Sequence, residues 1–197
     1  MVTVHKRFSG WFNIVAADAG GEGTPTDGHL VQKRLVDHWV RRVLLKRVDR
    51  MDSDHRPWRI AAVSGVRITS RDAITKIESL RVQSGALDTT ITEPLDFWRL
   101  RRILKFAPDA QVTLTATTQR DDDVVVLYAG ARRMRFHANG DGTYTLQWTV
   151  SSFTGVRHLG VNALSHGTLF DDAAPYDSQA WILPYIVAPT EMADMAS

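Results

Sequence analysis

The 197-residue sequence has no cysteine. This absence excludes a disulfide framework, a thiol nucleophile and every thiolate metal site. No apolar run approaches the roughly 20 residues that a membrane-spanning helix requires. The N-terminal apolar stretch, residues 11–17, is short and contains Asn13, so it does not have the pattern of a secretory signal. We therefore expect a soluble cytoplasmic protein with no membrane partner.

The motifs that usually identify an enzyme are also missing. The three glycines in residues 155–167 match neither a phosphate-binding loop nor a dinucleotide fingerprint. His158, His166 and Asp171-Asp172 lie near serines 151, 152 and 165, so composition leaves a Ser-His-Asp triad open. No Gly-x-Ser-x-Gly elbow supports that triad. We expect no catalytic residues and no cofactor, and favour a non-enzyme, although a site assembled from dispersed residues stays an alternative.

Two acidic clusters are candidate cation sites. Asp52, Ser53, Asp54 and His55 offer oxygen and imidazole ligands, but the further spaced ligands and the downstream glutamate of a calcium loop are absent. Asp121, Asp122 and Asp123 are adjacent, and adjacent side chains in a turn diverge. We interpret both clusters as loop and turn residues and expect no metal site.

What the chain does contain is typical of a globular protein. Hydrophobic residues make up 44% and charged residues 23% of the chain, close to the average for soluble domains. A chain of this length buries a core without staples. The length indicates one domain, or one domain with an appendage.

Two segments have the spacing of amphipathic helices. Residues 29–48 contain no Gly or Pro, and Leu35, Trp39 and Val43 recur every four residues beside a second stripe of the same spacing. Asp27 is the candidate N-cap. Residues 95–106 form the second predicted helix, which Pro108 follows.

The remaining elements are predicted strands. They cover residues 2–16, 58–70, 74–84, 89–92 and 111–118, a strand after the acidic turn, 132–138, 143–150 and 180–187. Residues 139–142, Asn-Gly-Asp-Gly, predict a hairpin turn. Pro184 predicts that the last strand lies at an edge or a bulge. Between about residue 151 and residue 180 the pattern is weak.

Together these elements predict an α+β fold in which two helices pack on one face of an antiparallel sheet. We divide the chain into an N-terminal strand and loop (1–28), an α+β core (29–150) and a β-rich C-terminal extension (151–197). The tail after the last strand is expected to fray.

Positive charge is concentrated in the two predicted helices. Residues 29–48 carry six basic residues and one acidic residue, and residues 95–106 carry four basic residues and one acidic residue. The rest of the chain is acidic. The exposed helical faces would present Arg34, Arg41 and Arg42 from the first helix and Trp98, Arg101, Arg102 and Lys105 from the second. Such a face is typical of a surface that meets phosphates, and an ordinary solvated face is the alternative.

The element order resembles one domain of a DNA sliding clamp. The similarity is strongest over residues 91–138, with leucines in the helix, Pro108-Asp109 in a turn, a Val112–Leu114 strand, an acidic turn and a strand over 132–136. The resemblance implies that the six basic residues named above would face duplex DNA. Clamp subunits contain two or three such domains, whereas this chain holds one with an extension, so the shared fold could serve another role.

Two functions follow as hypotheses. The first is a non-catalytic, clamp-like module that contacts nucleic acid without sequence preference through its basic helices. The second is a structural or assembly protein, such as a virion or multi-subunit component, whose basic helices contact acidic surfaces of neighbouring copies. Under either hypothesis we expect a homo-oligomer.

Overall fold

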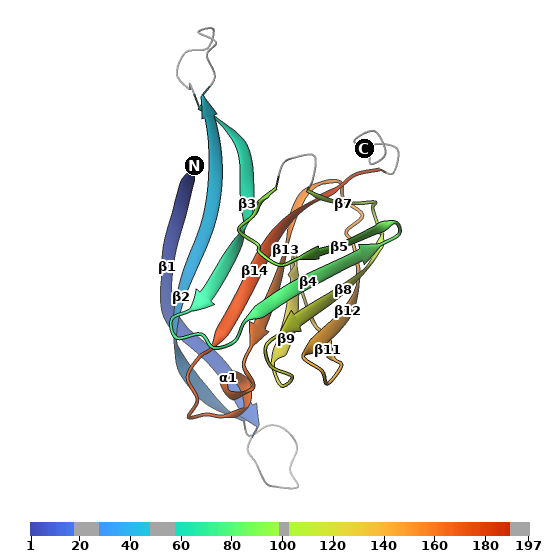
Figure 1. Ribbon diagram of the computed structural model, residues 1–197. Helices are drawn as coiled ribbons and strands as arrows, with labels where there is room; N and C mark the ends of the chain where they lie inside the picture. Colours follow the sequence, from blue (N-terminus) through green and yellow to red (C-terminus); the bar gives the residue numbers. More distant parts are fainter. Residues whose placement is uncertain (18–27, 48–57, 99–102, 190–197) are drawn as a thin grey trace.

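The computed structural model describes residues 1–17, 28–47, 58–98 and 103–189. Strands account for most of the described residues, and α1 (His166–Phe170) is the single helix among them. The strands form two antiparallel sheets that pack against each other as a sandwich (Figure 1). The predicted α+β class is therefore wrong.

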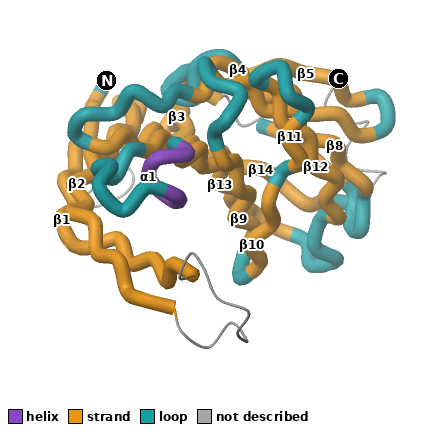
Figure 2. The backbone as a smooth tube through the Cα atoms, turned by 90° about the horizontal axis from the view of Figure 1, so that it is seen from below, coloured by secondary structure: helices purple, strands orange, loops and turns teal. Residues whose placement is uncertain are grey.

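The larger sheet contains strands from the beginning, the middle and the end of the sequence. Its order is β1 (Val2–Ala17), β2 (Gly28–Arg47), β3 (Trp58–Ser70), β14 (Ser178–Val187), β13 (Gly155–Leu164), β9 (Val124–Ala129) and β10 (Arg132–Arg135). Two short strands attach to it: β6 (Phe97–Trp98) pairs with β3, and β7 (Leu104–Phe106) pairs in parallel with β14. The sheet curves like a half-barrel (Figure 2). It draws strands from all three predicted segments.

The smaller sheet covers only the middle of the larger one. Its order is β11 (His137–Ala138), β12 (Thr143–Thr149), β8 (Gln111–Thr118), β4 (Ile77–Ser84) and β5 (Leu87–Ile91). In Figure 1 it runs obliquely in front of β14 and β13. Figure 2 shows β1 and β2 on the side of the molecule away from β8 and β12.

The hydrophobic core lies between the two sheets. Leu80, Val82 and Leu114 from the smaller sheet and Leu127 and Leu183 from the larger one have no exposed surface. Alternate residues of each strand supply this core, as a half-buried sheet requires. The buried cluster contains no residue of β1, β2 or β3. These three strands therefore extend the large sheet beyond the sandwich.

The predicted helix over residues 29–48 is the long strand β2. A spacing of four residues fits one helical turn, but it is also twice the two-residue period of a strand. In β2 the two apolar stripes lie on opposite faces of the strand: Leu35 and Trp39 on one, Val36 and Val40 on the other. The β-branched and aromatic residues of this segment favour the extended form. The candidate N-cap, Asp27, lies outside the described residues.

The predicted helix over residues 95–106 is also wrong. Phe97 and Trp98 form β6, and residues 104–106 form β7 with Leu104 and Phe106 buried on either side of Lys105. This alternation matches a strand. Residues 99–102 are outside the description. The resemblance to a sliding-clamp domain implied helices at both positions, and the described parts of both segments are strands instead.

Most predicted strands are confirmed. The predicted strands over 58–70 and 111–118 coincide with β3 and β8, and the turn at residues 139–142 connects β11 to β12 with Gly140 and Gly142 at positive φ. The largest omission is β13, a central strand, because Gly155, Gly160 and the polar residues between them mask its alternation.

The position predicted for the last strand is wrong, since β14 lies between β3 and β13. On one side of β14, pairing with β3 ends at Ile182 and pairing with β7 begins at Tyr185. Pro184 falls in the gap between these two partners. The missing N–H of proline therefore costs no ladder bond on that side.

Candidate functional site

The structure separates the residues predicted to bind nucleic acid. In the large sheet we call the face that carries Leu183 the inner face and the face that carries Ile182 the outer face. The register places Arg34 and Arg42 on the inner face and Arg41 on the outer face. Lys105 pairs with Ile186 and lies on the outer face.

The other predicted residues add no common surface to these four. Trp98 lies on β6, and its side chain is outside the description, as are Arg101 and Arg102. A strand presents alternate residues to opposite sides, so the single basic face expected of a helix does not form.

The concentration of positive charge nevertheless persists in β1, β2 and β3. These strands contain ten basic residues and one acidic residue, Asp37. The other described residues include nine basic and thirteen acidic ones. Asp121, Asp122 and Asp141 come together where the turn before β9 meets the turn before β12. The molecule therefore has a basic region beyond the sandwich and an acidic group of turns on the sandwich.

The two-stranded ribbon formed by residues 8–17 and 28–37 belongs to this basic region and exposes large apolar side chains. Before Asp37, over residues 28–36, strand β2 pairs with β1 on one side and with no strand on the other within the described residues. Trp11, Val15 and Leu30 share the inner face of the ribbon and are 63%, 76% and 59% exposed. Val15 and Leu30 are direct cross-strand partners. Val15 and Leu30 form an exposed apolar pair, and the hydrogen-bonded pair of Asn13 and Gln32 lies between this pair and Trp11.

The outer face of the ribbon is held by the segment around α1. Lys33 is only 5% exposed, and its Nζ donates to the carbonyl oxygens of Gly167 at 2.8 Å and Asp171 at 2.6 Å. The Phe12 ring contacts the Tyr176 ring with a centroid distance of 5.2 Å. Burial lowers the pKa of Lys33, and Asp171 and Asp172 oppose that effect. These contacts fix the ribbon against the body of the protein.

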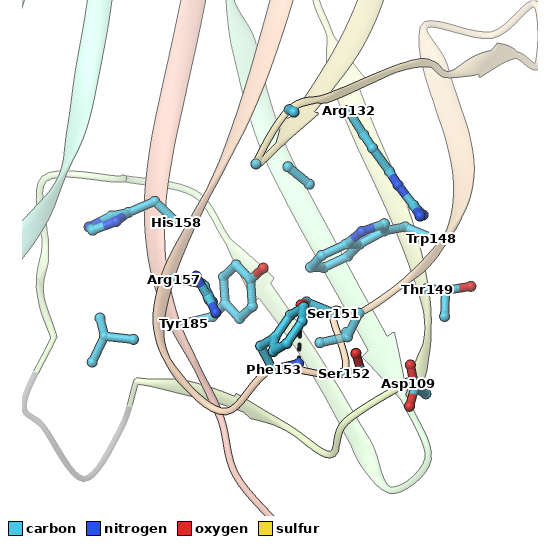
Figure 3. Close-up of a pocket in the computed structure, with 15 residues that line it drawn as sticks. Asp109, Arg132, Trp148, Thr149, Ser151, Ser152, Phe153, Arg157, His158 and Tyr185 are labelled. Carbon is cyan, nitrogen blue, oxygen red and sulfur yellow. Dashed lines mark hydrogen bonds between the residues drawn. The ribbon is translucent and has the colours of Figure 1, made fainter.

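A cleft of about 640 Å³ opens at one end of the sandwich (Figure 3). Trp148 and Tyr185 are buried and meet edge to face at 5.4 Å. Arg132, Arg157 and Asp109 also line it. Burial raises the pKa of Tyr185, and Arg157 acts in the opposite direction. The cleft therefore contains arginine hydrogen-bond donors together with the two aromatic rings of Trp148 and Tyr185.

The candidate triad and metal residues do not assemble into a reaction centre. Figure 3 draws His158 apart from Ser151 and Ser152, on the other side of Tyr185. Burial and the charge of Arg41 lower the pKa of His158. Ser151 instead accepts a hydrogen bond from the backbone N–H of Phe153 at 3.2 Å, and Ser165 caps α1.

Of the two acidic clusters, the one at residues 121–123 lies within the described residues. Asp121 and Asp122 are exposed, whereas Asp123 is buried, so the three side chains diverge as expected. Within the described ranges no group of three or more His, Cys, Asp or Glu residues is placed to hold a metal ion. The cluster at residues 52–55 falls outside them. No described helix has the length and apolar character needed to cross a membrane.

The sequence predicted one strand of the ribbon, since the predicted strand over 2–16 is β1, but it predicted a helix where β2 lies. Only the pairing of Val15 with Leu30 shows that these two residues share one exposed face. Comparison with known proteins adds no family: no family model, no curated protein and no solved structure matches the chain.

Proposed function

We propose that this protein is a structural subunit that assembles with copies of itself through strand β1. The observation that supports this most strongly is the composition of residues 8–17. This half of an edge strand contains no charged residue and no proline, and it carries Trp11 and Val15 with well over half of their side chains exposed.

Edge strands of monomeric proteins are normally protected. A free edge presents unpaired backbone N–H and C=O groups, and charge, proline, a bulge or a covering element usually prevents pairing with another chain. The pairing of β1 with β2 is continuous from Val2 to Ala17, without a bulge. Addition of a further strand to β1 satisfies the backbone groups and covers the exposed apolar pair of Val15 and Leu30.

The distribution of charge favours a second copy of the same chain as the partner, because one chain carries both a basic and an acidic surface. The basic region around His5, Lys6 and Arg7 is complementary to the acidic turns at Asp121, Asp122 and Asp141. These two surfaces lie on different parts of the molecule, so the contact is head-to-tail rather than two-fold. A head-to-tail contact closes into a ring or continues as a filament.

The test is light scattering coupled to size-exclusion chromatography, at low and high salt, with and without duplex DNA. We expect a defined oligomer without DNA. Trp11→Lys and Val15→Lys each add a charge to the free edge and should weaken assembly by about 2 kcal/mol or more, as for a central interface residue. The matched control is Val156→Lys, because Val156 is also an exposed valine, at 66%, but lies on a central strand.

Each result decides between the hypotheses. Assembly that is lost in Trp11→Lys and Val15→Lys but kept in Val156→Lys supports the proposal. Asp121→Lys should also weaken assembly, and more strongly at low salt, because exposed charges are screened as salt rises. A chain that stays monomeric at high concentration contradicts the proposal. A monomer that binds DNA only at low salt would favour the nucleic-acid hypothesis in its place.

A further inference from the structure

A second cavity lies on the outer face of the large sheet. It measures about 230 Å³, and its lining includes Asp37, Ile68, Tyr128, Asn162, Tyr176 and Ile182. Gly160 and Ala180 also line it and keep it open because their side chains are absent or small. The cavity thus combines apolar walls, two tyrosine rings and a few polar groups, as small-molecule sites usually do.

Two oxygen acceptors at this cavity have no hydrogen-bond donor. Asp37 Oδ1 and Asn162 Oδ1 are buried and lack a partner in the described structure. Buried polar atoms are nearly always paired, and an unpaired acceptor of this kind calls for a donor from water or from a bound molecule. Asp37 and Asn162 come from β2 and β13, which are not neighbours in the sheet. The arrangement therefore depends on the fold and not on one local turn.

The remaining polar groups are arranged around Tyr176. Ser178 Oγ donates to the Tyr176 hydroxyl oxygen at 2.7 Å, and that hydroxyl lies 3.5 Å from Asp37 Oδ2. Burial raises the pKa of Asp37, and it raises the pKa of Tyr176 to about 12. Tyr176 therefore remains a neutral hydroxyl group, and the second oxygen of Asp37 is already engaged.

The charge around the cavity identifies the class of molecule that would supply these donors. Lys6 lies over the Trp39 ring at 4.8 Å, and Arg133 lies over the Tyr128 ring at 5.5 Å. Arg41 is on the same face. Asp37 is the charged residue in the lining, and these neighbouring cations offset its attraction for an amine or guanidinium group. A neutral hydroxyl group donates a hydrogen bond without meeting a like charge.

We propose that the cavity at Asp37, Asn162 and Tyr128 binds a neutral polyhydroxylated ring, that is, one residue of a carbohydrate. Its hydroxyl groups donate to Asp37 and Asn162, and its C–H face lies against the tyrosine ring and Ile182. The cavity is on the middle strands and not at the edge of β1, so this proposal stands independently of the assembly proposal.

The experiment is saturation-transfer NMR followed by titration of the full chain with D-glucose, D-galactose and N-acetylglucosamine. D-glucosamine and D-glucuronate serve as the cationic and anionic comparison compounds. We expect at least one neutral sugar to bind more tightly than either charged sugar. Asn162→Ala and Asp37→Ala should each weaken that binding about tenfold or more, because each removes a buried acceptor.

A steric variant separates binding from folding. A Cβ at Gly160 would meet the Tyr128 Cβ at 3.6 Å and Ile182 Cγ1 at 3.9 Å, which are ordinary contacts, so Gly160→Ala should fold normally while it narrows the cavity. Asp72→Ala, an exposed aspartate on the β3–β4 connection, is the control for Asp37→Ala. Loss of sugar binding in Gly160→Ala but not in Asp72→Ala supports the proposal.

Three results would overturn it. One is the absence of binding by every neutral sugar, and another is tighter binding of glucosamine, which would point to a cation site at Asp37. The third is neutral-sugar binding that Gly160→Ala, Asn162→Ala and Asp37→Ala all leave unchanged, because the sugar would then bind elsewhere on the protein.

Discussion

The side chain of Asp177 holds the connection between the two sheets, and its removal should destabilise the protein strongly. Asp177 is 8% exposed. Its Oδ1 accepts from the backbone N–H of Ile74 at 3.1 Å, and its Oδ2 accepts from the Thr75 hydroxyl at 3.0 Å. The backbone N–H of Thr75 reaches both oxygens at 3.2 Å. These donors belong to the connection between β3 and β4, where the chain passes from the larger to the smaller sheet.

The cost of Asp177→Ala can be worked from these bonds. Thr75 has no exposed surface, so its donors find no water when the carboxylate is gone. Each buried donor left unpaired costs about 1–3 kcal/mol. The two donors of Thr75 therefore give a loss of about 4 kcal/mol, a large part of the 5–15 kcal/mol by which domains are stable. At about 2–4 °C per kcal/mol, the melting temperature should fall by about 10 °C.

Urea unfolding followed by tryptophan fluorescence measures this loss, with Asp72→Ala as the exposed control. Asp177→Asn retains one acceptor but turns an NH₂ group toward the donors, so it should not restore stability. A loss below about 1 kcal/mol for Asp177→Ala, with an unchanged denaturant slope, would refute the reasoning, because the donors would then have other partners.

Three further predictions concern single residues. Gly65→Ala places a Cβ 2.7 and 2.8 Å from two backbone oxygens and should cost at least about 2 kcal/mol in urea unfolding, whereas Gly10→Ala meets nothing within 4 Å and should be close to neutral. Burial raises the pKa of Asp123, so the folded state binds its proton more tightly than the unfolded state and stability falls as pH rises through that raised pKa. Asp123→Asn should therefore be the more stable protein at pH 7, by about 1–3 kcal/mol, and the difference should shrink in acid; an equal difference at both pH values would contradict this. Lys33→Ala leaves two carbonyl groups without their donor and should speed amide hydrogen exchange in the ribbon more than in β14.

The sequence predicted a segment correctly where its spacing of apolar residues fits only one kind of secondary structure. It failed where the spacing fits both a helix and a strand. The strand over 111–118 alternates Val112, Leu114 and Ala116 against polar residues, and this pattern has only one interpretation. In β2 an apolar residue every fourth position satisfies both a helix and a strand. The decision lies in tertiary pairing, since β1 pairs with β2 from Gly28 to Val43 and β3 pairs with it from Asp37 to Arg47.

The candidate sites were less accessible to prediction than the strands. Asp37 and Asn162 are 125 positions apart in the sequence, and neither belongs to a recognisable motif. They line the same cavity because β3 and β14 join β2 and β13 into one sheet. No local pattern predicts such an arrangement, because strand order depends on long-range packing. The same strand order places Pro184 in an inner strand, where its missing N–H had predicted an edge or a bulge.

The change from helix to strand alters which faces the basic residues occupy, but these residues stay concentrated in one region of the molecule. A helix would have collected Arg34, Arg41 and Arg42 on one side, as a phosphate-contacting surface needs. A strand distributes them over two faces, which weakens the case for a duplex lying along one face. The segregation of charge along the chain does not depend on secondary structure, so β1–β3 remain basic and the turns at Asp121 and Asp141 remain acidic. Charge complementarity between copies is therefore expected for the strand as it was for the helix. The uncharged half of β1 would supply the free edge with which a second copy pairs.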